Sequence, residues 1–129
     1  MRSKAGRVFG GFADQSWDSD SDDYKSDENA FIFSIDRQTI YRPVASHKAI
    51  YSKSTCGPSF GCDALGLVGD QLNQEDGGHC FTNGDHNGPI YRIKSDSQGI
   101  HEVTGEGKGQ QDDEKTFTCV ELEVFAVTF

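Results

Sequence analysis

The sequence of 129 residues is 34% hydrophobic and carries a formal net charge of −9 at pH 7. This length suits one domain with a single core, for which nine Phe and four Tyr supply much of the apolar surface. The negative charge argues against binding of nucleic acid or anionic membranes, because such binding needs clustered Lys and Arg. No apolar run reaches the length of about 20 residues that a membrane-spanning helix needs.

The four cysteines, Cys56, Cys62, Cys80 and Cys119, have spacings that match no compact disulfide framework. They also lack the closely spaced pairs that structural zinc sites use. The first residues contain no apolar region typical of a signal peptide. We therefore expect a cytoplasmic protein with reduced thiols.

At the start of the chain, residues 1–6 predict a polar lead-in, and Val8–Phe9 predict the end of a short strand. The pair Gly10 and Gly11 allows positive φ or close approach of other groups, which indicates a bulge or tight bend. Asp14–Glu28 is rich in Asp and Ser and predicts a loop.

Trp17 lies inside this acidic loop. A tryptophan in such a position usually folds back as a lid on the core, which is the interpretation we favour. The alternative is an exposed anchor that binds a partner.

Asn29–Ile35 is the most strongly predicted strand, and because both of its faces are largely apolar we expect it to be central and covered on both sides. Weaker patterns predict further short strands at 39–43, 48–53, 64–68, 79–82 and 90–93. Turns are expected at 55–61, which contains Gly57 and Gly61, and at 83–88. Residues 94–115 form a long polar stretch that we expect to be mobile.

Phe117–Phe129 predicts a closing strand. One apolar face of this strand contains Val120, Leu122, Val124 and Ala126. On the other face we expect three further side chains to point into the core: Phe125, Val127 and Phe129. Short strands between Gly-, Asn- and Asp-rich loops, with no long helical period, predict a mostly β fold (α+β at most). The specific expectation is a two-sheet antiparallel β-sandwich.

Asp18, Asp20 and Asp22 alternate like the start of a calcium-binding loop. The EF-hand pattern then fails, because Asp23 stands where glycine is required and Asn29 where the closing acid is required. We favour a solvated acidic loop and no metal site, with a surface cation site at the three aspartates as the alternative.

Glu121 and Glu123 share one strand face, with Cα atoms about 6–7 Å apart at 3.3 Å per residue. Such a pair is usually a solvated face, and acid/base catalysis is the alternative. No nucleophile signature such as G-x-S-x-G occurs. We therefore expect no enzyme, no catalytic residue and no cofactor.

Several of these stretches together resemble the TLDc domain family. Phe9–Phe12 with Trp17 is similar to the family's FGG[YF] motif and its tryptophan, and Lys25–Ser34 is similar to its most apolar strand. Lys48–Tyr51, Gly57–Gly61 and Val120–Phe125 resemble three further family motifs in the same order. Cys62 and the residues after it depart from the family's glycine and Asp-Leu pattern.

The resemblance covers roughly residues 7–127 and implies a TLDc-like domain at 7–129 that lacks the family's N-terminal helical segment and strand. A missing strand would leave an open sheet edge. The family is not an established enzyme class, and its members are associated with oxidative-stress resistance and with binding the vacuolar proton pump (V-ATPase). The resemblance therefore implies a cytoplasmic protein-binding module with a V-ATPase subunit as partner. In that picture Gly10, Gly11, Gly57 and Gly61 shape the backbone.

Three hypotheses follow from the sequence. The first is this non-catalytic interaction module, with Trp17, Glu121 and Glu123 as candidate partner-binding residues. The second is a hydrolase or antioxidant enzyme that uses Glu121 and Glu123 or a thiol. The third is a cation- or ligand-binding β-sandwich. The oligomeric state stays open.

Overall fold

The computed structural model describes residues 1–18, 21–62, 64–68, 72–75, 77–80, 90–107 and 115–128. Within these ranges the chain forms antiparallel sheets and one turn of 3₁₀ helix, η1 (Ser46–Lys48). The mostly β, antiparallel fold that the sequence predicts is therefore confirmed.

The strands fall into three sheets. The first contains, in spatial order, β10 (Thr116–Phe117), β9 (Gly78–His79), β8 (Leu65–Val68), β7 (Cys56–Phe60), β6 (Ile50–Ser52) and β3 (Asp23–Lys25). The second contains β2 (Phe9–Phe12), β4 (Phe31–Ser34) and β5 (Thr39–Tyr41). The third pairs β1 (Arg2–Ser3) with β11 (Cys119–Glu121).

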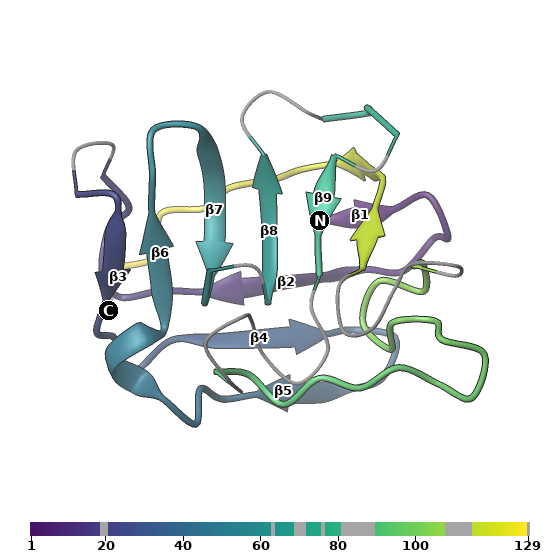
Figure 1. Ribbon diagram of the computed structural model, residues 1–129, viewed down its shortest axis with the longest axis horizontal. Helices are drawn as coiled ribbons and strands as arrows, with labels where there is room; N and C mark the ends of the chain where they lie inside the picture. The colour runs from purple at the N-terminus through teal and green to yellow at the C-terminus, as the bar shows by residue number, and fades with distance from the viewer. Residues whose placement is uncertain are drawn as a thin grey trace.

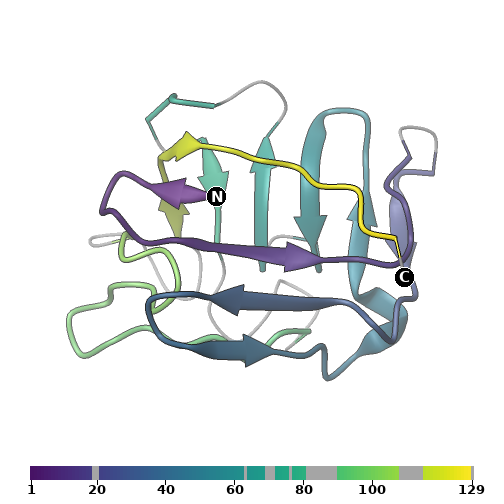
Figure 2. The ribbon, with the colours of Figure 1, turned by 180° about the vertical axis from the view of Figure 1, so that it is seen from behind.

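The two larger sheets form two layers whose strands cross at nearly right angles (Figure 1). The view from behind shows that β2 and the C-terminal segment, residues 122–128, both cross the six-stranded sheet in the same direction (Figure 2). This arrangement places the end of the chain beside β2.

The core lies between these layers and is rich in aromatic side chains. Phe9 of β2 meets Phe117 of β10 edge-to-face, with ring centroids 5.4 Å apart. Phe60 of β7 meets Tyr91 in the same way, at 6.4 Å. The Tyr91 hydroxyl donates a hydrogen bond of 2.9 Å to the Ala49 carbonyl oxygen, so this buried phenol is satisfied.

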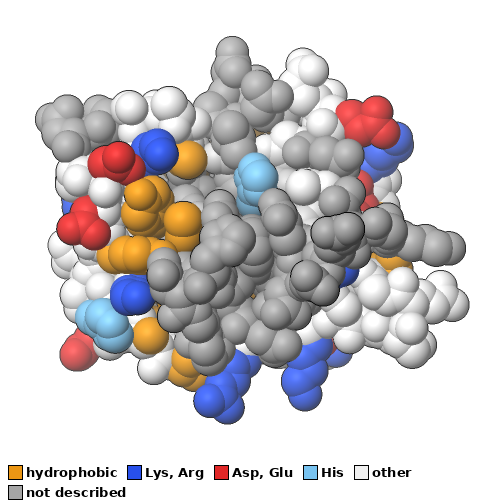
Figure 3. Space-filling model, viewed as in Figure 1, with side chains coloured by type: hydrophobic (Ala, Val, Ile, Leu, Met, Phe, Trp, Pro, Cys, Tyr) orange, Lys and Arg blue, Asp and Glu red, His pale blue; other side chains and the backbone are white. Residues whose placement is uncertain are grey.

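The outer face of the six-stranded sheet carries hydrophobic side chains over β6 and β7 (Figure 3). Tyr51 of β6 is the cross-strand partner of Tyr24 on β3, and their rings meet edge-to-face at 5.0 Å. The Lys48 ammonium lies 5.2 Å from the centre of the Tyr24 ring. β3 itself lies inside the stretch 14–28 that the sequence predicts to be a loop, so that prediction is wrong for Asp23–Lys25.

β4 confirms the strand predicted in 29–35, and it is central in its sheet as expected. Its cover is uneven: Ile32 and Ser34 are buried, whereas Phe31 and Phe33 are half-buried. Ile35 is 59% exposed. The expectation of full cover on both faces is therefore wrong for the face that carries the two phenylalanines.

The glycine pair of β2 forms no bulge and no bend. Gly10 and Gly11 pair in regular register with Phe33 and Ile32 of β4, and neither glycine has positive φ. A Cβ on Gly10 would lie 2.9 Å from the tip of the Phe33 ring, and a Cβ on Gly11 would collide with the Phe60 ring. The predicted bulge or bend is therefore wrong, and glycine is needed here because two aromatic rings approach the strand.

The turn predicted at 55–61 is wrong, because Cys56–Phe60 forms β7. Its first half is irregular, and the register with β8 shifts between Cys56 and Ser59. That irregularity accommodates Pro58 inside a sheet. Gly61, which follows the strand, has φ +60°, so a turn of the kind predicted begins there.

The strand predicted at 90–93 is also wrong. Ile90, Tyr91 and Ile93 are all buried, but the only strand-type pairing of this stretch with other described residues is an isolated bridge between Tyr91 and Pro43. The apolar pattern of residues 90–93 therefore arises because these side chains pack in the core, although their backbone does not form a strand. The predicted strand at 79–82 is met in part by β9, and the turn at 83–88 lies outside the described residues.

The closing strand is the largest correction. β11 ends at Glu121, and residues 122–128 form no ladder with any described residue. Val124 is 76% and Phe125 is 74% exposed, so the side chains expected to enter the core lie in solvent. The lead-in predicted at 1–6 contains β1, which pairs with β11.

Candidate functional site

A groove of about 750 Å³ lies between β2 and the C-terminal segment. One wall of the groove comes from β2 and β4, and β7 contributes Pro58 and Phe60. Residues 121–127 contribute the opposite wall, which we call the C-terminal wall. Phe31 of β4 stacks on Phe12 of β2 with ring centroids 5.4 Å apart. The groove is therefore lined largely by apolar and aromatic side chains, as protein and ligand sites commonly are.

The outer edge of β2 borders this groove, because β2 is the first strand in the order β2-β4-β5. The amide of Ile35 donates to the Val8 carbonyl oxygen at 2.9 Å, which makes Val8 and Ile35 a hydrogen-bonded pair. Alternation along an antiparallel ladder then turns the N–H and C=O groups of Phe9 and Gly11 away from β4. They point toward the groove side of the strand.

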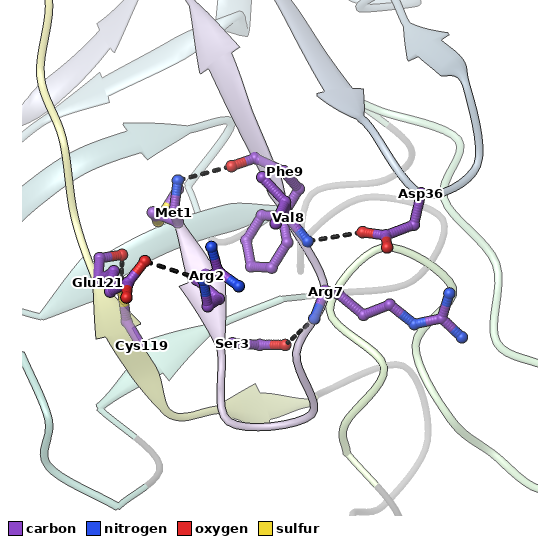
Figure 4. Close-up of polar contacts among 9 residues, drawn as sticks. All are labelled: Met1, Arg2, Ser3, Arg7, Val8, Phe9, Asp36, Cys119 and Glu121. Carbon is purple, nitrogen blue, oxygen red and sulfur yellow. Dashed lines mark hydrogen bonds and ion pairs between the residues drawn. The ribbon is translucent and has the colours of Figure 1, made fainter.

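Only the start of this edge has a partner in the described part of the chain. The Phe9 amide donates to the Met1 carbonyl oxygen at 3.1 Å, and the Met1 amino group donates to the Phe9 carbonyl oxygen at 2.7 Å. Figure 4 shows Met1 beside Phe9, with Arg2 reaching Glu121 on the other side. Among the described residues, none pairs with the outward backbone groups of Gly11.

Glu121 and Glu123 lie at the rim of the groove. The Glu121 carboxylate accepts a hydrogen bond of 2.8 Å from the Arg2 Nε. The side chains of Arg2 and Glu121 are both exposed. Because β11 ends at Glu121, the shared strand face that the sequence predicts for the two glutamates does not form. Their roles in partner binding or catalysis stay predictions.

Trp17 folds back onto the molecule at one end of the groove. Its Nε1 donates a hydrogen bond of 3.0 Å to the Ser59 carbonyl oxygen. Its ring meets Phe60 edge-to-face with centroids 5.4 Å apart. This is the lid arrangement that the sequence favours, and it leaves the indole half-buried.

Asp27 is a structural residue that sequence reasoning missed. Its buried carboxylate accepts four backbone hydrogen bonds, from Asp14 and Gln15 at 2.7 and 3.0 Å and from Asn29 and Ala30 at 2.9 Å each. It thereby ties the end of β2 to the start of β4. The pattern Asp27-x-Asn29 is a recognisable signal for such an Asx turn.

The acidic loop does not gather its carboxylates around one point in the described residues. Asp18 pairs with Lys25 and accepts from the Ser21 amide, and these hydrogen bonds hold the pKa of Asp18 well below its usual range. Asp22 accepts from the Tyr51 hydroxyl at 2.8 Å, which raises the pKa of Tyr51 to about 12. Asp20 lies outside the described residues.

Among the described residues, no three His, Cys, Asp or Glu side chains gather in a way that would hold a metal ion. In the same part of the chain, no helix has the length and apolar character needed to cross a bilayer. None of the four cysteines, which all lie in the described residues, forms a disulfide bond.

The family model of the TLDc domain matches residues 1–128. The chain belongs to the TLDc domain family. The resemblance seen in the FGGF, GPSFG and closing motifs is thus confirmed. No curated protein and no solved structure matches the chain.

Within this TLDc domain, the four motif glycines differ in role. At Gly10 and Gly11 the absence of a Cβ makes room for aromatic rings. Gly61 has a positive φ, which allows the chain to turn directly after β7. Gly57 has an ordinary φ, and a Cβ there would only touch Leu67 at 3.4 Å. Three of the four therefore have a clear geometric requirement for glycine.

Proposed function

We propose that this TLDc domain is a non-catalytic protein-interaction module and that partners bind at the groove beside β2. The observation that carries the proposal is the exposure of apolar side chains on the C-terminal wall, at Leu122, Val124, Phe125 and Val127. Contiguous exposed apolar surface next to an apolar groove is typical of interaction sites.

Membership in the TLDc family supports a more specific form of this proposal. By family resemblance, the partner is a subunit of the V-ATPase, the setting is the cytoplasm and the role is in resistance to oxidative stress. The net charge of −9 suits a basic surface on such a partner, since complementary charge speeds encounter and selects partners.

Binding to purified V-ATPase, immobilised on a sensor surface, tests this function. Val124→Ser removes apolar contact from the exposed wall without adding charge, and we expect it to weaken binding about ten-fold. Val44→Ser is the matched control, because Val44 is 53% exposed and does not line the groove. Equal binding by both variants would contradict the groove as the site, and no binding by the unaltered chain would contradict the pump as the partner.

A further inference from the structure

Positive charge is concentrated in one part of this acidic chain. Two stretches, residues 37–62 and 90–94, contain half of the 12 Lys and Arg residues and none of the 21 Asp and Glu residues. The cations in these stretches are Arg37, Arg42, Lys48, Lys53, Arg92 and Lys94. The stretches are neighbours in space, because Pro43 and Tyr91 form an antiparallel bridge. Lys and Arg side chains stand along the lower edge of the molecule in Figure 3, the edge at which β5 lies in Figure 1.

The bridge between the two stretches brings two arginines together. Tyr91 is fully buried and Pro43 is half-buried, so both of these side chains point inward. The residues that flank an antiparallel bridge point to the opposite side, which places Arg42 and Arg92 next to each other on the surface. Both arginines are exposed. Like charges side by side destabilise such a pairing, and an anion bound between them would relieve that repulsion.

Two further exposed side chains complete this surface. Lys94 is exposed and lies two positions after Arg92. Ile40 of β5 lies two positions before Arg42 and is 58% exposed. We call these four residues the basic face. None of them belongs to the lining of the groove beside β2.

The charges of the basic face are available to a ligand. The Arg42 guanidinium lies 5.7 Å from the centre of the Phe31 ring, which orients the cation without neutralising it. The Glu102 carboxylate is already engaged, by Arg37 at 3.3 Å and by the amide of Lys94 at 3.1 Å. Within the described part of the chain, no carboxylate forms an ion pair with a side chain of the basic face.

We propose that the basic face binds a short acidic segment of a partner protein. Carboxylates of the segment lie on Arg42 and Arg92, and an apolar side chain beside them contacts Ile40. Guanidinium groups suit this role because each can donate two parallel hydrogen bonds to one carboxylate. The basic face is separate from the groove, so the inference goes beyond the proposed function and does not depend on it.

The charge distribution favours a short segment over other anionic occupants. A membrane or a nucleic acid presents an extended negative surface, which would also meet the acidic remainder of a chain with net charge −9. A second copy of the chain carries the same charge, and its acidic loop on the basic face would give head-to-tail pairing that leaves one basic face open. A short segment contacts the basic face alone.

Three synthetic nonapeptides test the inference on the full chain by titration calorimetry. The acidic peptide alternates Glu with Thr and has one central Leu. The neutral peptide has Gln for each Glu, and the serine peptide has Ser for the central Leu. We expect the acidic peptide to bind about ten-fold more tightly than the neutral peptide, because Gln keeps the shape of Glu but lacks its charge. This binding should weaken as salt is added.

Matched variants locate the peptide. Arg42→Gln/Arg92→Gln removes both guanidinium groups, and we expect it to weaken binding of the acidic peptide about ten-fold. Lys4→Gln/Arg7→Gln is the control, because these two side chains are also exposed but lie outside the basic face. Salt at about 0.15 M screens charges beyond about 8 Å, so the control should bind the peptide like the unaltered chain. Circular dichroism checks that each variant is folded.

A double-mutant cycle tests the apolar contact. Ile40→Ser should weaken binding of the acidic peptide several-fold and leave binding of the serine peptide unchanged, because the contact that it removes is the one with Leu.

Several outcomes would overturn the inference. The titrations would do so through equal binding of the acidic and neutral peptides, equal binding by the Gln double variant and its control, an equal effect of Ile40→Ser on both Glu-containing peptides, or no heat with the acidic peptide. Binding to phosphatidylserine vesicles that is lost in Arg42→Gln/Arg92→Gln would favour a lipid surface instead, and a dimer in sedimentation lost in that variant would favour a second copy. If V-ATPase binds and the acidic peptide does not, this inference fails alone. If the acidic peptide binds and V-ATPase does not, only the proposed partner fails.

Discussion

At the residue scale, two adjacent glycines let β2 lie between aromatic rings from different layers. Phe33 approaches Gly10 and Phe60 approaches Gly11, so each hydrogen in place of a side chain makes room for a ring. Phe60 in turn contacts Trp17 and Tyr91. Gly11 therefore determines how closely β2 can pack on β7, and Gly10 makes room for a ring of the neighbouring strand β4.

Gly11→Ala should destabilise the domain by about 2–3 kcal/mol, because the new methyl group collides with the buried Phe60 ring and over-packs the core. Denaturant unfolding monitored by circular dichroism measures the loss. Gly57→Ala is the control, since its methyl group would make only ordinary contact with Leu67. A Gly11→Ala domain as stable as the Gly57→Ala domain would show that the close approach is not needed.

At the element scale, a segment with the apolar alternation of a strand forms a strand only when a neighbouring strand pairs with it. β4 has both, since apolar alternation coincides with neighbours on each side. Residues 122–128 have the alternation of a strand but lack a neighbour within the described part of the chain. Because these residues form no ladder, their backbone N–H and C=O groups form hydrogen bonds with water, and their apolar side chains stay exposed.

Amide hydrogens of residues 122–128 should exchange with solvent much faster than those of β7 and β8, because their N–H groups have no protein acceptor among the described residues. Hydrogen–deuterium exchange followed by mass spectrometry measures the difference. The paired residues Cys119–Glu121 of β11 are the control within the same stretch of chain. Protection of 122–128 equal to that of β8 would show that a ladder forms there after all.

At the scale of the whole molecule, burial couples stability to pH through a core thiol. Burial raises the pKa of Cys80 from 9.0 to about 12, with Thr104 close enough to share a hydrogen bond at 3.5 Å. Between these two pH values the unfolded chain loses this proton while the folded chain keeps it. The free energy of unfolding therefore falls as pH rises from 9 toward 12.

Cys80→Ala should remove this contribution, which has a slope of about 1.4 kcal/mol per pH unit for one proton. Denaturant unfolding with a reducing agent, at intervals from pH 8.5 to 11, measures the slope. Val103→Ala is the control, because it trims another fully buried side chain without a titratable group and should lower stability equally at every pH. The same slope in both variants would rule out the thiol as its source.

Much of the fold follows from local pattern. The strands at 31–34, 39–41, 50–52 and 65–68 all lie within stretches that the sequence predicts, since β-branched and aromatic residues alternate between turn residues there. The failures have local causes as well. Gly57 and Pro58 are turn residues in most contexts, yet a register shift lets β7 hold them, and local preference cannot reveal a register shift.

Residue chemistry by itself determined the β class and the acidic net charge. The ordered motifs of the sequence indicated the TLDc family by resemblance. The space between β2 and the C-terminal wall was decided only by tertiary structure, because it depends on which strands become neighbours. Residues 2–3 and 119–121 are more than a hundred positions apart, and their pairing defines the width of that space. Alternation tells which side chains share a face, but only the assembled sheets determine whether a face or an edge is covered.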